Sequence, residues 1–191
     1  PKVLHLFQNK PMILHILEKA LAINPLKIYI IVGRHKDQIE NTIKKYIGLN
    51  YSYDINDKIK YIVQKDACGT GDAIKTFCKN INYLKLLDTK VLILSGDVPL
   101  ISIDTMQQML NSKYQTNVLV SYTEKNFGYG RIIQKYDSVN KKYDLVKIVE
   151  EKDFTEEEKK IKFINTGIYS FNCYTLNKYI FKIENENSQS E

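Results

Sequence analysis

The 191-residue sequence predicts an α/β fold, a three-layer sandwich in which helices cover both faces of a mostly parallel, mixed sheet that gains antiparallel strands in its second half. Two patterns support this prediction. Strand-like and helical segments alternate three times along the first half, whereas the second half contains short β-rich segments separated by turns. The composition, 43% hydrophobic and 26% charged residues, is that of an ordinary globular domain and excludes disordered, collagen-like and coiled-coil chains.

The first predicted helix covers residues 12–21, where apolar residues recur at helical spacing and Pro11 suits the first turn. Residues 27–32 form a continuous β-branched and aromatic run that ends at Gly33, as expected of a strand buried on both faces. The alternation continues with a helix at 36–47, a strand at 60–64, a helix at 71–81, a strand at 90–95 and a helix at 102–112. Strands connected through helices in this way are expected to run parallel.

The second half is predicted to add strands that run antiparallel. These short segments lie at residues 116–123, 130–134 and 143–149. Thr155 and Glu158 form a Thr-x-x-Glu capping pattern, which predicts a short helix over residues 155–160. A strand and a final helix follow, at residues 163–171 and 174–183.

Charge and cysteine content limit the possible partners. The net charge of +6 is scattered along the chain, and only Arg34 and Arg131 of the 28 basic residues are arginine, so a solvated surface explains the charge better than nucleic-acid binding. The three cysteines are widely spaced without a C-x-x-C pair, which indicates neither a disulfide framework nor a zinc knuckle and favours a reducing cytoplasm. No apolar run approaches the roughly 20 residues that span a bilayer, so no membrane partner is predicted.

The most informative segment is the apolar run at residues 91–94, which is followed by Ser95, Gly96 and Asp97. A carboxylate at the C-terminal end of a buried strand lies where open α/β sheets bind their ligands, and it suits a metal ion. Capping of the following turn is an equally good explanation of Asp97 from spacing alone.

A second candidate site is Gly69-Thr70-Gly71-Asp72, which follows the predicted strand ending at Gln64 and opens a helix. Glycines permit close approach of a ligand, and the N–H groups of a helix start suit a nucleotide base or phosphate. The segment lacks the third glycine of a dinucleotide-binding fingerprint. A simple strand-to-helix turn is therefore the better explanation from this segment alone.

Three later segments have simple structural explanations. Glycines flank Tyr129 as in a hairpin turn, and residues 150–153 suit a solvated charge run. Asn165-Thr166-Gly167 interrupts a strand, which marks either a bulge or a close approach of a ligand.

In combination and in this order, the segments resemble one family. The motifs are P-K-V-L-H at 1–5, K-P-M at 10–12, Gln64 with G-T-G at 69–71, G-D-V-P-L-I at 96–101, G-Y-G-R-I at 128–132, V-E-E-K-D at 149–153 and I-N-T-G-I at 164–168. Over essentially its whole length the chain resembles the N-terminal pyrophosphorylase domain of the bacterial bifunctional enzyme N-acetylglucosamine-1-phosphate uridylyltransferase/glucosamine-1-phosphate acetyltransferase. The resemblance implies a Rossmann-like nucleotidyltransferase fold of the GT-A-like type.

The resemblance implies transfer of uridylyl from UTP to N-acetylglucosamine 1-phosphate, which gives UDP-N-acetylglucosamine and pyrophosphate for cell-envelope polysaccharides. It further implies a Mg²⁺ cofactor, a cytoplasmic location and a homotrimeric parent enzyme. Two alternatives remain open: another sugar-1-phosphate nucleotidyltransferase, or a non-catalytic domain that binds nucleotide sugars.

Individual roles also follow from the resemblance. Lys2 and Asp97 are the implied catalytic residues, and Asp97 is the implied Mg²⁺ ligand. The residues expected to bind the nucleotide are Lys2, Gln64, Gly69 and Thr70. The residues expected around the sugar are Ser95, Gly96, Gly130, Glu150, Lys152 and Asn165.

The sequence also departs from the family pattern. Ser95 stands where the family usually has an aromatic residue or threonine, Cys68 where leucine is common, and Asp72 where a histidine or similar residue often occurs. The family's Gly-rich L-x-A-G-x-G-T-x-M loop is expected upstream of residue 1. Its second Mg²⁺ ligand, an asparagine, and its acetyltransferase β-helix domain are expected beyond residue 191. We therefore expect residues 1–191 to be a pyrophosphorylase domain that is incomplete at both ends and that is inactive on its own.

Overall fold

The computed structural model describes residues 1–51, 54–65 and 69–183, so Cys68 lies outside the described residues. The strands are β1 (Leu6–Phe7), β2 (Lys10–Pro11), β3 (Ile28–Val32), β4 (Ile59–Val63), β5 (Lys90–Ile93), β6 (Thr116–Tyr122), β7 (Arg131–Asp137), β8 (Lys142–Val149) and β9 (Phe163–Asn172). The α-helices are α1 (Met12–Ala22), α2 (Lys36–Asn50), α3 (Asp54–Lys58), α4 (Gly69–Asn80), α5 (Ile103–Asn111) and α6 (Cys173–Ile180). Short 3₁₀ turns are η1 (Lys2–Leu4), η2 (Tyr83–Lys85), η3 (Glu151–Asp153) and η4 (Glu158–Lys160).

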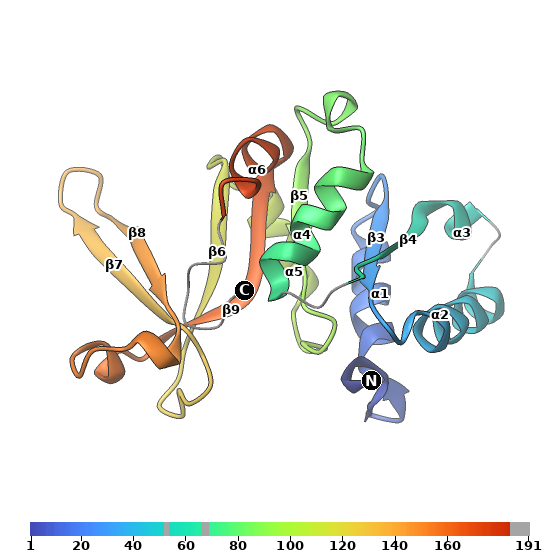
Figure 1. Cartoon of the computed structure of the whole chain (residues 1–191), viewed down its shortest axis with the longest axis horizontal. Coiled ribbons are helices and arrows are strands. Elements are labelled where there is room, and N and C mark those ends of the chain that lie inside the picture. Colours follow the sequence, from blue (N-terminus) through green and yellow to red (C-terminus); the bar gives the residue numbers. More distant parts are fainter. Residues whose placement is uncertain (52–53, 66–68, 184–191) are drawn as a thin grey trace.

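Backbone pairing divides the described strands into three groups. β1 and β2 form a small antiparallel hairpin, and β3 pairs in parallel with β4. The largest group has the order β5-β9-β7-β8, with β6 also paired to β9, and all of its pairings are antiparallel. In Figure 1 the β7–β8 hairpin extends away from the helices, on the left of the view.

Side-chain packing joins β3 to β5 and creates the predicted three layers. Ile28 of β3 and Leu92 of β5 pack into one cluster with α5 and the end of α1. On the opposite face, Tyr29 of β3 and Val91 of β5 pack against α4 and α6. The alternation of side chains along each strand explains why neighbouring residues contribute to opposite faces. The prediction of an α/β sandwich with helices on both faces is therefore confirmed.

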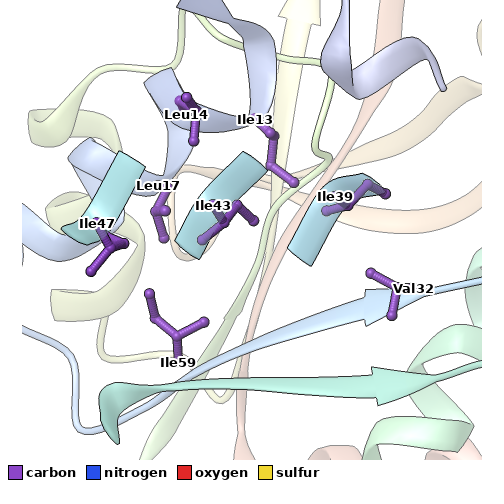
Figure 2. Packing of buried hydrophobic residues seen from close by; sticks show 8 residues of the cluster. All are labelled: Ile13, Leu14, Leu17, Val32, Ile39, Ile43, Ile47 and Ile59. Carbon is purple, nitrogen blue, oxygen red and sulfur yellow. The ribbon is translucent and has the colours of Figure 1, made fainter. Parts of the chain in front are cut away.

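A core of aliphatic side chains packs α1 and α2 onto the parallel strand pair (Figure 2). In α2, Ile39, Ile43 and Ile47 lie four residues apart on one helical face, and Ile43 and Ile47 are completely buried. They meet residues of α1 such as Leu17, while Val32 closes the cluster from β3. Burial of each such side chain stabilises the fold by about 1.5–3 kcal/mol.

The sheet contains less parallel pairing than the strand–helix alternation suggests. Among the described residues, β3 and β4 form the parallel pair, whereas β5 pairs antiparallel with β9, from Lys90 with Asn172 to Ile93 with Tyr169. The alternation gives the order of strands and helices along the chain. Which strands pair depends on contacts between segments that are distant in the sequence. The mixed character of the sheet is confirmed, but its mostly parallel composition is not seen in these pairings.

Element boundaries agree with the sequence within a few residues, with five additions. The β1–β2 hairpin, the one-turn helix α3 and the turns η1, η2 and η3 were not expected, because two-residue strands and single turns carry no measurable periodicity. The helix predicted at 155–160 is reduced to the η4 turn, although its capping contacts form: the Glu158 carboxylate accepts from the Thr155 N–H at 2.9 Å. The final helix ends at Ile180.

Across the part of the chain that the structure describes, no helix has both the length and the apolar character needed to cross a bilayer. Cys78 and Cys173 are free and buried within the layers on α4 and α6, as the absence of a disulfide pattern predicts for them.

Candidate active site

Asp97 follows the end of β5 and lies against two predicted site residues. The Ser95 hydroxyl donates a hydrogen bond to Asp97 Oδ1 at 2.5 Å, and the Lys2 ammonium lies 2.7 Å from Asp97 Oδ2. The ammonium and its hydrogen bond lower the pKa of the Asp97 carboxyl below its usual range, and the Ser95 hydroxyl adds to this effect. The hydrogen bond to Asp97 and the negative charge of Asp97 in turn raise the pKa of Lys2. Both groups are therefore charged at neutral pH.

The loop that carries Asp97 is held from two sides. A Cβ atom at Gly96 would come within 3.0 Å of Val3 Cγ1, so the absence of a side chain lets the η1 turn, and with it Lys2, approach the loop. On the far side of Asp97, the Lys19 ammonium of α1 donates to the Pro99 carbonyl at 2.6 Å. These contacts fix the carboxylate at the C-terminal end of β5.

Asp97 is suited to hold a hard cation together with phosphate oxygens. Among the described residues, no three His, Cys, Asp or Glu side chains gather into a complete metal cage. Mg²⁺ is often held by only one or two carboxylates, with water and substrate phosphates as its other ligands. Asp97 is a single ionised carboxylate that already binds the Lys2 ammonium, and its oxygens are of the type that Mg²⁺ prefers as ligands.

The nucleotide-side residues meet at the end of β4 and the start of α4. The Gln64 side-chain amide donates to Asp72 Oδ2 at 2.7 Å and to the Gly69 carbonyl at 3.4 Å. The Gln64 backbone N–H also continues the β3–β4 ladder by donating to Val32 O at 2.8 Å. Thr70 is exposed in the first turn of α4. The structure thus brings Gln64 and Gly69 together, with Thr70 next along the helix.

Asp72 contacts the expected site residue Gln64, and sequence reasoning did not assign it this role. Its carboxylate can only accept hydrogen bonds, so it holds the NH₂ end of the Gln64 amide toward α4. The side-chain oxygen of Gln64 is the group left to accept a hydrogen bond from a ligand. The departure from the family pattern at position 72 was the available signal.

Three of the residues expected around the sugar lie in or next to β7, β8 and β9, where these strands meet. A Cβ atom on Gly130, just before β7, would lie 2.8 Å from Oε1 of Glu150, which follows β8. The Asn165 N–H of β9 donates to the Gly130 carbonyl at 2.8 Å. Gly130, Glu150 and Asn165 are therefore neighbours, although 35 residues separate the first from the last. Lys152 is exposed in the η3 turn, two residues beyond Glu150.

A buried arginine supports the Gly130 segment. Arg131 is only 3% exposed, and its guanidinium donates to the carbonyls of Asn126 at 2.7 Å and Tyr129 at 2.5 Å. The guanidinium also lies over the Phe154 ring, 4.5 Å from the centroid, so it connects the turn before β7 to the chain that follows η3. Sequence reasoning placed Arg131 in the motif but gave it no role.

Antiparallel pairing relates the Asp97 and Asn165 ends of the site. Ile93 of β5 lies opposite Tyr169 of β9. In an antiparallel pair, the residues that follow Ile93 and those that precede Tyr169 extend toward the same end. Asp97 and Asn165 therefore lie beyond the same end of the β5–β9 pair, and the Gly130–Glu150 contact is at that end as well.

The comparisons identify the family and the fold. A protein-family model described as "Nucleotidyl transferase" matches residues 1–191. A curated relative, the probable UDP-N-acetylglucosamine pyrophosphorylase of Acanthamoeba polyphaga mimivirus, is 34% identical over 195 residues, which cover 100% of this chain and 71% of the relative.

Solved structures share the fold at lower identity. UDP-glucose pyrophosphorylase complexed with UDP-glucose superposes with a TM-score of 0.72 at 20% identity, covering 99% of this chain and 74% of that one. A putative glucose-1-phosphate thymidylyltransferase from Bacillus anthracis gives a TM-score of 0.64 at 20% identity, covering 96% of this chain and 67% of that one. At this identity the similarity establishes the α/β architecture.

Proposed function

The chain belongs to the nucleotidyl transferase family, and from this premise we propose that it transfers uridylyl from UTP to N-acetylglucosamine 1-phosphate, giving UDP-N-acetylglucosamine and pyrophosphate. The observation that carries the proposal is the meeting of Gly130, Glu150 and Asn165 at the same end of the sheet as Asp97. The 34% identity to a relative named as a UDP-N-acetylglucosamine pyrophosphorylase supports the choice of sugar and base.

The reaction requires in-line displacement at the α-phosphorus of UTP. An oxygen of the sugar phosphate forms the new P–O bond, and the bond to pyrophosphate breaks. The attacking phosphate is already anionic at neutral pH, so the chain needs no general base. Catalysis is then mainly positioning of the two substrates and stabilisation of negative charge.

In this proposal each group of residues has one task. The Gln64 oxygen accepts a hydrogen bond from the uracil edge, and the Gly69–Thr70 backbone lies beside the base. Glu150 accepts from sugar hydroxyl or amide hydrogens, Asn165 binds the same sugar, and the ammonium of Lys2 attracts phosphate oxygens. Mg²⁺ bound at Asp97 would supply charge neutralisation at the phosphates.

Ser95, Gly96 and Lys152 have supporting tasks in the proposal. Ser95 orients the Asp97 carboxylate through its hydrogen bond, and Gly96 keeps the loop close to η1. Lys152, exposed beside Glu150, supplies a positive charge near the sugar phosphate. These tasks use the hydroxyl of Ser95, the missing side chain of Gly96 and the ammonium of Lys152.

The test is pyrophosphate release with Mg²⁺ by the purified full-length protein, which carries the loop and the asparagine expected outside residues 1–191. UTP should be compared with CTP, dTTP and ATP, and N-acetylglucosamine 1-phosphate with glucose 1-phosphate. The proposal expects the highest kcat/KM for UTP with N-acetylglucosamine 1-phosphate. A preference for another pair would identify a different sugar-1-phosphate nucleotidyltransferase. Binding of UDP-N-acetylglucosamine without turnover would indicate a binding domain and would overturn the proposed reaction.

A further inference from the structure

The hydroxyl of Tyr169 lies against the side-chain amide of Asn165. Asn165 Nδ2 donates to the Tyr169 hydroxyl oxygen at 2.7 Å, and that hydroxyl lies 3.0 Å from Asn165 Oδ1. In a regular strand, residues four positions apart are separated by about 13 Å. A direct contact between these two side chains therefore needs a local departure from regular strand geometry.

β9 contains such a departure between the two residues. Its partner β6 advances only from Val118 to Val120 while β9 runs from Tyr169 back to Asn165, so extra residues of β9 bulge out of the pairing. Gly167 lies inside the bulge with φ of +73°, a left-handed conformation that glycine adopts without strain. The bulge shortens the path between Asn165 and Tyr169 and brings their polar groups together.

Two contacts fix the orientation of the Asn165 amide. Its oxygen accepts from the Gly167 N–H at 3.2 Å, which directs the NH₂ end toward Tyr169. The Tyr169 oxygen uses one of the two Nδ2 hydrogens. The second Nδ2 hydrogen is then available to a ligand acceptor, such as the carbonyl oxygen of an acetamido group.

Tyr169 is placed to influence the sugar side and the Asp97 loop together. Its backbone pairs with Ile93, two residues before Ser95. Its side chain is half-buried, and burial raises the pKa of its hydroxyl; the charge of Glu150 raises it further, against the hydrogen bond from Asn165. The phenol therefore stays protonated at neutral pH, and Glu150 is close enough for its charge to act on it.

We propose that Tyr169 is a positioning residue that holds the Asn165 amide ready for the sugar phosphate. The inference rests on the proposed function and adds a residue to it. It makes the second Nδ2 hydrogen of Asn165 the donor that recognises the sugar, and Tyr169 acts on the substrate only through that amide.

The first experiment compares Tyr169→Phe with the unmodified protein. Loss of one neutral hydrogen bond should raise KM for N-acetylglucosamine 1-phosphate about 3- to 10-fold, while kcat and KM for UTP change less than about twofold. Tyr29→Phe is the matched control, because Tyr29 is another partly buried strand tyrosine, packed edge-on against Phe77 at 5.1 Å. It should leave all three constants unchanged.

A double-mutant cycle separates positioning from direct contact. In the Asn165→Ala background, Tyr169→Phe should raise KM for the sugar phosphate no further, because the amide that Tyr169 orients is gone. Urea unfolding of the four proteins checks that each variant is folded. Independent, multiplicative effects on KM would overturn the inference and show that Tyr169 acts without Asn165. An unchanged KM in Tyr169→Phe would overturn it equally.

Kinetics of the unmodified protein and of the variants distinguish a wrong function from a wrong role of Tyr169. If the unmodified full-length protein shows no turnover of N-acetylglucosamine 1-phosphate, the proposed function is wrong, and the inference is lost with it. If the unmodified protein is active and the Tyr169 variants behave like Tyr29→Phe, the proposed function stands and only the positioning role is overturned.

Discussion

Gly130→Ala should damage the sugar side of the site while leaving the fold intact. A Cβ atom at this position would lie 2.8 Å from Glu150 Oε1 and 3.2 Å from both Cδ and Oε2 of the same side chain. Carbon and oxygen atoms cannot remain at 2.8 Å, so the Glu150 carboxylate must move. Glu150 is an exposed residue with a flexible side chain, so its displacement costs little folding free energy.

The size of the effect follows from the hydrogen bond that the displaced carboxylate can no longer make. A hydrogen bond to a charged group contributes about 1.5–3 kcal/mol, which corresponds to a roughly 10- to 150-fold loss in kcat/KM for N-acetylglucosamine 1-phosphate. KM for UTP should stay within about twofold, because Gln64 and Gly69 lie on the β4–α4 side of the site. The urea midpoint should remain close to that of the unmodified protein.

Gly48→Ala provides the matched control. A Cβ atom there meets no neighbouring atom within 4 Å, and Gly48 lies inside α2, far along the chain from the sugar-side residues. Alanine should stabilise this helix by about 0.5–1 kcal/mol and leave the kinetic constants unchanged. The reasoning is refuted if Gly130→Ala keeps its full kcat/KM for the sugar phosphate, or if UTP binding weakens to the same extent.

Three further outcomes are expected. Asp97→Asn should keep the circular dichroism spectrum and urea midpoint but lower kcat more than tenfold at saturating Mg²⁺; more than a tenth of the original kcat would remove Asp97 from catalysis. Asn165→Ala should raise KM for N-acetylglucosamine 1-phosphate by the equivalent of about 1–3 kcal/mol, and a parallel loss of UTP affinity in a binding titration would place Asn165 elsewhere. The contacts of Glu158 with Thr155 and Lys147 lower its pKa from 4.5 to about 2, so the stability from this carboxylate is present above pH 4.5 and lost as pH falls toward 2. Urea unfolding between these pH values should therefore be less pH-dependent in Glu158→Gln than in the unmodified protein.

Local patterns in the sequence were enough to predict most elements of this fold. The stripe of Ile39, Ile43 and Ile47 determines which face of α2 is buried, and the run from Ile28 to Val32 suits a strand covered on both sides. The Thr155–Glu158 capping contacts were also predictable, because they need only residues three positions apart. In each case neighbours in the sequence contain the physical cause.

Strand pairing and the fine geometry of the site depend on contacts that local patterns do not contain. The edge of β5 is occupied by β9, about 80 residues later, and no periodicity of β5 indicates that partner. The family resemblance implied that Gly130 and Glu150 both bind the sugar, whereas spacing alone suggested a hairpin turn and a solvated charge run, and neither predicted the close approach of the two residues. Tyr169 was missed because the sequence pattern predicted a regular strand. Its contact with Asn165 forms only because β9 contains a bulge between the two residues.

The position of β9 explains how one strand can place both Asn165 and the Asp97 loop. Its C-terminal half pairs with β5, which leads directly to Ser95 and Asp97, and its N-terminal half holds Asn165 against Gly130. Because side chains alternate along a strand, a slip of one residue would turn the buried Ile168 toward the opposite face. The α5 packing of Ile168 therefore fixes the register of β9, and with it the placement of Asn165 relative to the Asp97 loop. Core packing and site geometry are thus set by the same strand.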